Sequence, residues 1–155
     1  MPIPEFVAEL RAMIGTHPLW LPGITAVVRR GDDVLLVQRA DNGQWTPITG
    51  ISDPGEEGAV TARREVLEET GVHVRVDRLA ATSVMRDVVH GNGDRASYFD
   101  LTFACTWLDG DAHVADDESM AVRWAARDDL PPMTELMRWR VEAGLSDERE
   151  ARFRG

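Results

Sequence analysis

Residues 50–72 read GISDPGEEGAVTARREVLEETGV, and this stretch decides how the rest of the chain is interpreted. Its first part belongs to a segment from Asp41 to Gly58 that is rich in Gly, Pro, Asp and Asn, which is typical of a long loop, here around a short extended piece at Trp45. Residues 59–70 then have helical character, and Gly71 stands where a helix commonly ends in a left-handed residue. Long loops in compact domains are usually functional or disordered, so this loop and its helix are the first candidates for a site.

The predicted helix carries three glutamates along one edge. At about 100° per residue, Glu65 and Glu69 lie on the flank of a narrow apolar stripe, where core meets solvent, and Glu68 lies beside them. Like charges this close repel each other, and a divalent cation would turn that repulsion into coordination. Oxygen ligands suit Mg²⁺ or Mn²⁺ rather than zinc, and Arg64 could orient one carboxylate by pairing with it. Taken alone, however, a glutamate-rich helix face is more often simply solvated.

The wider spacing favours the metal site. From Gly50 to Val72 the chain follows the pattern Gly-x5-Glu-x7-Arg-Glu-U-x-Glu-Glu-x-Gly-U, in which U is a bulky aliphatic residue, without a mismatch. By average residue usage, a chance match in a chain of this length is on the order of one in ten million. This pattern is the Nudix box. The sequence therefore resembles the Nudix hydrolase family, with its MutT-like and ADP-ribose pyrophosphatase-like members, over roughly residues 24–132.

The order of elements predicts an α/β (α+β) fold. We predict a hairpin of two strands at residues 24–29 and 34–39, and further strands at 72–76, 82–89, 97–107 and 120–124. Two more helices are predicted at residues 5–14 and 134–143. The resemblance implies a Nudix-type α/β/α sandwich with a central mixed sheet. We expect residues 1–155 to form one domain, with a helix within 1–17 and a tail at 146–155 as extensions.

The resemblance also implies roles for the residues of the box. Glu68 and Glu69 correspond to metal ligands, and Glu65 to a position that is a ligand in some members and the general base in others. Glu56 corresponds to an auxiliary carboxylate that often reaches the metal through water, and the carbonyl of Gly50 to a further ligand. Arg64 corresponds to the residue that orients a carboxylate. The implied cofactor is Mg²⁺, with Mn²⁺ as the alternative ion.

The implied reaction is attack by water on a phosphorus of a diphosphate, assisted by a carboxylate base. We favour Glu65 as the base, because crowding by other carboxylates and by the edge of the core would raise its pKa. The rival is Glu118, in an acidic loop that could swing over the site. The alternative for this loop is an exposed acidic turn. The implied substrate is a nucleoside diphosphate derivative or a nucleoside triphosphate.

Residues that recognise the substrate are harder to identify. Many family members have Leu-Pro-Gly-Gly where this chain has Pro47-Ile48-Thr49-Gly50, so the Thr49 side chain could point at the substrate. Trp20 could stack on a base or pack the N-terminal helix onto the sheet. The other candidate substrate-binding residues are Arg39, which resembles a family arginine at a strand end, and Tyr98 and Arg86, near the glycine-containing turn 90–94.

Composition excludes several other classes of protein. A net charge of −10 argues against binding long nucleic acid. No signal peptide or membrane-spanning stretch is visible, so we expect a cytoplasmic protein without a membrane partner. The single cysteine, Cys105, excludes an intrachain disulfide and a thiolate zinc site, and its apolar surroundings predict a core residue.

Two alternatives keep the fold but change the function. A non-catalytic ligand-binding or regulatory protein should have lost some of the metal-binding carboxylates, whereas this chain has all of them. An isomerase would call for a catalytic cysteine, and Cys105 lies in a predicted core strand. A homodimer is common in the family.

Overall fold

The structure is a computed structural model that describes residues 3–155. In chain order its elements are α1 (Glu5–Ile14), β1 (Leu19–Arg30), β2 (Asp33–Arg39), β3 (Trp45–Thr46), β4 (Ile48–Ile51), α2 (Gly58–Thr70), β5 (His73–Val89), β6 (Arg95–Asp109), β7 (Ser119–Ala126) and α3 (Glu135–Leu145). Helix α2 ends at Gly71, which has φ 69° and donates its N–H to the carbonyl of Leu67, so the predicted left-handed cap is confirmed.

The strands form one mixed sheet with β1 near its centre. β1 pairs in parallel with β6 along residues 19–29, and β6 pairs antiparallel with β5 at the outer edge. On its other side β1 pairs antiparallel first with β4 and then, at Arg29 and Arg30, with β2. β2 continues away from β1 and pairs antiparallel with β7 and β3. The predicted hairpin of β1 and β2 is confirmed, but the two strands pair with each other only next to the turn.

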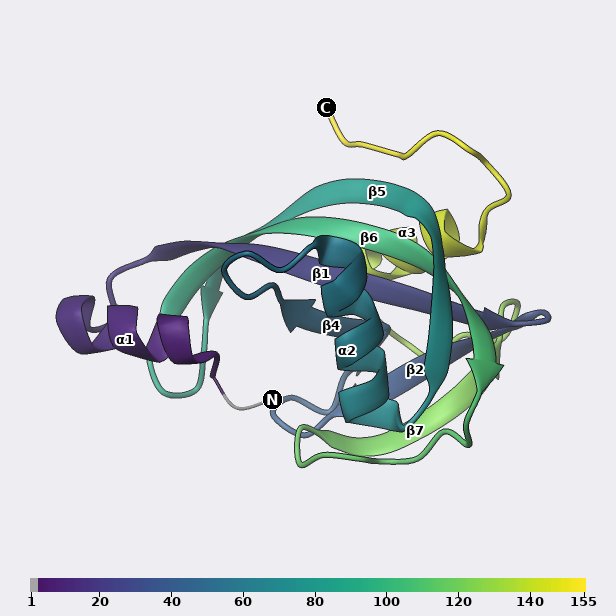
Figure 1. The fold of residues 1–155 in the computed structure, drawn as a ribbon, viewed down its shortest axis with the longest axis horizontal. Coiled ribbons are helices and arrows are strands. Elements are labelled where there is room, and N and C mark those ends of the chain that lie inside the picture. Colours follow the sequence, from purple (N-terminus) through teal and green to yellow (C-terminus); the bar gives the residue numbers. More distant parts are fainter. Residues whose placement is uncertain (1–2) are drawn as a thin grey trace.

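Helices α2 and α3 lie on opposite faces of this sheet (Figure 1). Ala62 and Val66 of α2 pack on the side chains of β1 that include Ile24 and Ala26. The next residue along β1, Val27, points the other way and packs with Val141 and Leu145 of α3. The predicted α/β/α sandwich with a mixed sheet is therefore confirmed.

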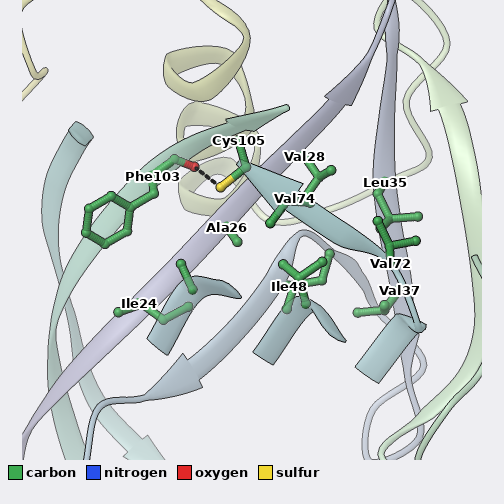
Figure 2. Packing of buried hydrophobic residues seen from close by; sticks show 12 residues of the cluster. Ile24, Ala26, Val28, Leu35, Val37, Ile48, Val72, Val74, Phe103 and Cys105 are labelled. Carbon is green, nitrogen blue, oxygen red and sulfur yellow. Dashed lines mark hydrogen bonds between the residues drawn. The ribbon is translucent and has the colours of Figure 1, made fainter. Parts of the chain in front are cut away.

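Cys105 belongs to the core between the sheet and α2. It is fully buried, and Figure 2 shows its thiol directed at the carbonyl of Phe103, 3.9 Å away. Burial raises the pKa of this thiol to about 12, so it stays protonated and unreactive at neutral pH. The prediction of a core residue is confirmed.

Helix α1 packs at the far end of β1, away from the α2–α3 sandwich (Figure 1). Its Val7 is buried against Leu21 of β1 and Ala96 of β6, and Phe6 covers the edge of this small cluster. Among the described residues, no helix is both long and apolar enough to cross a membrane.

Three predictions about strands were wrong. Residues 48–51 are strand β4 rather than loop, because their pairing with β1 outweighs a composition that favours turns. β1 begins at Leu19, five residues earlier than predicted from Ile24, because β6 pairs with it throughout. Residues 73–89 form one strand rather than two. β5 stays paired with β6 through the polar residues between the two predicted strands, and the pairing register shifts at several points along the way.

The tail is held to the sheet by a backbone bridge at Arg152, by Arg78, which donates to the carbonyl of Ser146, and by Arg29, which pairs with Asp147. Arg152 forms a bridge with Ala81, in which the N–H of Arg152 donates to Ala80 (2.9 Å) and its carbonyl accepts from Thr82 (2.9 Å). No part of residues 146–155 is helical.

A buried ion pair joins α3 to the sheet. Arg140 and Asp100 are 1% and 3% exposed, and their charged groups lie 3.3 Å apart. Thr25 and Thr102 donate to the two oxygens of Asp100, each at 2.8 Å, and Arg140 donates to Ser83 at 3.0 Å. Both members of the pair are thus hydrogen-bonded to the sheet, and Nη2 of Arg140 is buried without a hydrogen-bond partner among the described residues.

Candidate metal and catalytic site

The glutamates of α2 meet the sheet at β4. Gly50 pairs with Ile24 of β1 and lies directly beneath Glu65, so that a Cβ at this position would overlap the Glu65 side chain. A glycine is therefore required at residue 50 by close approach rather than by its backbone angles. β4, the strand that the sequence did not predict, is the floor of the site.

Glu56 and Arg64 fix the loop before α2. The guanidinium of Arg64 donates to both oxygens of Glu56, at 3.0 and 2.9 Å, and the hydroxyl of Thr61 donates to the same carboxylate at 2.8 Å. The hydrogen bonds from Arg64 are the main reason that the pKa of Glu56 falls to about 2. Glu56 is thus an ionised, fully paired carboxylate at the start of the helix.

Arg64 also holds the next glutamates of the box. It donates to Glu65 at 3.0 Å and to Glu68 at 3.2 Å, and its guanidinium lies 3.9 Å from Asp53. The single guanidinium group of Arg64 therefore contacts several carboxylates at once. This geometry agrees with the orienting role that the sequence suggested for Arg64, and Asp53 is a neighbour that the sequence did not single out.

Glu65 is more deeply buried than predicted. We expected it at the boundary between core and solvent, but its side chain is 0% exposed because β4 covers it. Only Oε1 faces Arg64, and Oε2 is buried without a hydrogen-bond partner among the described residues. Burial raises the pKa of Glu65 to about 7, against the opposing effect of Arg64. An oxygen left in this state is expected to take a proton or a cation.

Glu69 and Glu68 differ in their surroundings although they are adjacent. Glu69 is 4% exposed, and burial, followed by the charges of Glu65 and Asp116, raises its pKa to about 8. The side chain of Glu68 is 52% exposed and reaches toward solvent beside Arg64. α2 thus presents two buried carboxylates that resist ionisation and one that remains hydrated.

The acidic loop 110–118 is fixed beside Glu69. Its backbone N–H groups at His113 and Ala115 donate to the carbonyls of Thr70 and Glu69, both at 3.1 Å. At its other end the carbonyl of Glu118 accepts from Ala40 at 2.8 Å. The prediction of a loop that swings over the site is therefore replaced by a loop already fastened to α2, with Asp116 close enough to influence Glu69.

Two of the predicted substrate-binding residues lie toward the same end of the sheet. Arg39 forms a two-pronged ion pair with Asp41, at 2.9 and 2.7 Å, and Asp41 is the main reason that the pKa of Arg39 is raised, with Glu69 a weaker cause. The hydroxyl of Tyr98 lies 2.8 Å from a ring nitrogen of His90. Burial raises the pKa of Tyr98, against the charges of Arg11 and Arg39.

The other three predicted substrate-binding residues are not gathered around the glutamates. Alternation along β4 places Thr49 on the opposite face from Gly50. Trp20 is 62% exposed at the start of β1, so it does not pack α1 onto the sheet. Arg86 is exposed next to Asp87, a residue with φ 53° at an irregularity of β5, and no contact within residues 3–155 joins it to α2.

The residues present fit a hard divalent cation in chemistry. The donors near α2 are carboxylate oxygens and backbone carbonyls, which Mg²⁺ and Mn²⁺ prefer, and Glu65 Oε2 is buried without a partner. Within residues 3–155 the acidic side chains do not yet converge as a ready-made group of three. Arg64 instead pairs with Glu65 and Glu68 through one oxygen of each carboxylate.

Comparison with known proteins matches residues 20–144 to the model of the NUDIX domain. A MutT-like protein from Streptomyces ambofaciens is 35% identical over 114 residues, which cover 74% of this chain and 67% of that protein. The NAD-capped RNA hydrolase NudC of Pseudomonas syringae pv. tomato is 31% identical over 156 aligned residues, 91% of this chain. The chain spans about half of that relative's length, 52%.

Solved structures are similar over most of the chain. A MutT NUDIX hydrolase from Burkholderia pseudomallei has a TM-score of 0.64 at 27% identity, covering 80% of this chain and 97% of that one. An ADP-ribose pyrophosphatase from Streptococcus suis has a TM-score of 0.64 at 28% identity, covering 86% and 98%.

Proposed function

The chain belongs to the Nudix hydrolase family, a class of pyrophosphohydrolases, and on that basis we propose that it uses Mg²⁺ to hydrolyse a diphosphate linkage in a nucleoside diphosphate derivative or a nucleoside triphosphate. The observation that carries the proposal is Glu65, a buried carboxylate with one unpartnered oxygen, next to Glu68 and Glu69 and against Gly50. The names of the relatives support a nucleotide-derived substrate, because they include a hydrolase of NAD-capped RNA and an ADP-ribose pyrophosphatase.

The proposed metal ligands are Glu68 and Glu69, the carbonyl of Gly50, and Glu56 through water, and Glu65 is either a further ligand or the general base. When bound, Mg²⁺ would neutralise phosphate oxygens and acidify a water molecule, with Mn²⁺ as the alternative ion. Glu56 already has its full set of partners, so its main proposed task is to keep Arg64 in place. Arg64 in turn restrains Glu65 and Glu68.

The proposed reaction forms a bond between the water oxygen and one phosphorus and breaks the bond from that phosphorus to the bridging oxygen. Glu65 takes the proton of the attacking water, and the bridging oxygen leaves with the second phosphate. A general base works best when its pKa lies near the operating pH, and the pKa of Glu65 is about 7. Glu118 is the alternative base, since the loop that carries it is fastened to Glu69.

A hydrolysis panel tests the proposal. Purified protein with Mg²⁺ is given nucleoside triphosphates, nucleotide sugars, ADP-ribose and a dinucleotide, and release of phosphate, pyrophosphate and nucleoside monophosphate is measured. We expect turnover of at least one compound, its loss in excess EDTA, and its loss in Glu69→Gln with the fold retained. Metal-dependent binding without any turnover would support the non-catalytic alternative instead. A homodimer, a single-domain organisation and a cytoplasmic location stay predictions.

A further inference from the structure

A groove runs between α1 and the loop that precedes α2. It consists of two hollows with volumes of about 350 and 500 Å³, and both are lined by Phe6, Asp53 and Pro54. Figure 1 shows this loop extending from the sandwich toward α1. The two hollows adjoin at these shared residues, and together they offer room for a ligand of nucleotide size.

The groove reaches the exposed edge of the candidate metal site at Glu68. The larger hollow is lined by Arg64 and Glu68, together with Ile51 and Glu9. Among the described residues that line the two hollows, Arg64 is the one basic residue, and it is already engaged by several carboxylates. A phosphate group at this end would therefore depend on a cation for its neutralisation.

The other end of the groove is aromatic and apolar. The smaller hollow is lined by Phe6, Phe99, Leu101 and Pro22, and by residues of the loop that include Glu56. Phe99 is 42% exposed, and the neighbouring Trp20 is 62% exposed with its ring centre 6.3 Å from that of Phe99. Exposed aromatic rings beside a polar site are typical of surfaces that bind flat ligands.

We propose that this groove binds the base of the substrate, with Phe99 and Phe6 packing against the ring and the diphosphate lying toward Arg64 and Glu68. The inference rests on the proposed hydrolysis of a nucleotide-like diphosphate. It commits the far end of the substrate to a neutral aromatic group rather than a second phosphate, because no basic side chain lines the smaller hollow within the described chain. Asp53, whose carboxylate is 53% exposed, favours a base that presents N–H donors to it.

The groove is partly built by a segment that the family model does not match. The NUDIX match begins at residue 20, whereas Phe6 belongs to α1. Phe6 would therefore add an aromatic wall from outside the matched domain to a surface that otherwise lies within it. Trp20 is assigned to the edge of the groove, where its fluorescence is a natural reporter of a bound base.

Binding of product analogues tests the inference without turnover. Affinities for AMP, GMP, CMP, UMP and ribose 5-phosphate are measured by calorimetry in Mg²⁺, and Trp20→Phe identifies how much of any fluorescence quenching comes from Trp20. We expect the purine monophosphates to bind on the order of tenfold more tightly than ribose 5-phosphate, a typical effect of stacking one base on an aromatic side chain. Equal affinity for AMP and ribose 5-phosphate would overturn the inference.

Variants locate the binding surface. Phe99→Ala and Phe6→Ala should weaken AMP binding on the order of tenfold and leave ribose 5-phosphate unchanged, and Phe99→Leu keeps the apolar area if the alanine variant unfolds. Phe153→Ala removes a ring that is 80% exposed in the tail and is the matched control. AMP binding that is the same in wild type, Phe99→Leu and Phe6→Ala contradicts the inference. Base binding that depends on Phe99 in a protein without hydrolytic activity would contradict the proposed function alone.

Discussion

Gly50 lies so close to Glu65 that no side-chain atom fits between β4 and α2 at this point. The backbone of β4 therefore determines where the buried carboxylate can lie, and the carboxylate in turn leaves one oxygen without a partner. The strand and the helix therefore cannot shift toward each other at this point without a clash. The site is preorganised by main-chain geometry, which catalysis by charged groups requires.

Gly50→Ala tests this relationship. The added Cβ would overlap the Glu65 side chain and force strand or helix to move, and a displacement of about 1 Å at a reacting group can cost on the order of 100-fold in rate. We expect a loss of that size in kcat with an overpacking cost of about 1–3 kcal/mol in unfolding free energy. Gly91→Ala is the control, because a Cβ there meets nothing within 4 Å. Wild-type activity in Gly50→Ala would refute the tight contact.

Arg64→Lys should destabilise the protein in a pH-dependent way. The pKa of Glu56 is lowered to about 2 from an ordinary 4.5, so its pairing with Arg64 contributes stability that is present above pH 4.5 and is lost as the pH falls toward 2. A lysine cannot reproduce the two-pronged contact. In urea unfolding, the free energy of unfolding of Arg64→Lys should therefore be lower than that of wild type at pH 6, and this difference should be smaller at pH 3. Arg63→Lys, at an exposed position next to it, should show no such trend.

Mg²⁺ should stabilise the protein more at high pH than at low pH. The pKa values of Glu65 and Glu69 are raised to about 7 and 8, so without metal the stability that goes with their protonated forms is present below pH 4.5 and is lost as the pH rises through 7 and 8. Mg²⁺ binds the ionised forms. Without Mg²⁺, the midpoint temperature of thermal unfolding should fall as the pH is raised from 6 to 9. With Mg²⁺, the midpoint temperature should change less over the same pH range.

A pair of variants checks the source of this pH effect. Glu69→Gln cannot ionise and should reduce both the pH dependence and the stabilisation by Mg²⁺. Glu57→Gln changes an exposed glutamate at the start of the same helix and should behave like wild type. Equal stabilisation by Mg²⁺ at pH 6 and pH 9 would argue that the cation binds elsewhere.

Glu65→Gln and Glu118→Gln distinguish the two candidate bases. Loss of a general base typically costs 10²–10⁴-fold in rate and removes the acidic limb of the pH profile. We expect that result for Glu65→Gln and a smaller effect for Glu118→Gln, measured as kcat against pH at saturating Mg²⁺. The reverse order would assign the proton transfer to the loop 110–118.

Asp100→Ala should be among the most destabilising single changes outside the site. It leaves Arg140 buried and charged, and breaking such a pair from one side typically costs about 3–5 kcal/mol. Adding Arg140→Met to Asp100→Ala should recover much of that loss, because no uncompensated charge remains. Urea unfolding of the two single variants and the double variant measures this coupling.

The sequence predicted the helix of the box because its signals are local. The fixed spacing from Gly50 through Glu56 and Arg64 to Gly71 contains the loop, the helix and its cap, and none of these depends on distant parts of the chain. β4 was missed for the opposite reason. Residues 48–51 become a strand through their pairing with β1, and a single sequence carries no direct signal for such a partner.

The depth of the site could not be predicted either. A helical wheel places Glu65 on a flank of α2, but the contact with β4 buries its side chain completely. Likewise, Arg140 follows Trp139 in an ordinary helical stretch, and only the fold brings it to Asp100, 40 residues away along the chain. Contacts made between distant segments set the pKa values, so residue types alone indicate which groups are present but not how readily they ionise.

Main-chain groups fasten the loop 110–118 to the last turn of α2. The N–H groups of His113 and Ala115 donate to the carbonyls of Thr70 and Glu69 whatever side chains the two donor residues carry. This attachment differs from that of the loop before α2, which relies on the side chains of Glu56 and Arg64. The two main-chain bonds act as a fixed anchor from which Asp116 reaches the neighbourhood of Glu69 and influences its pKa.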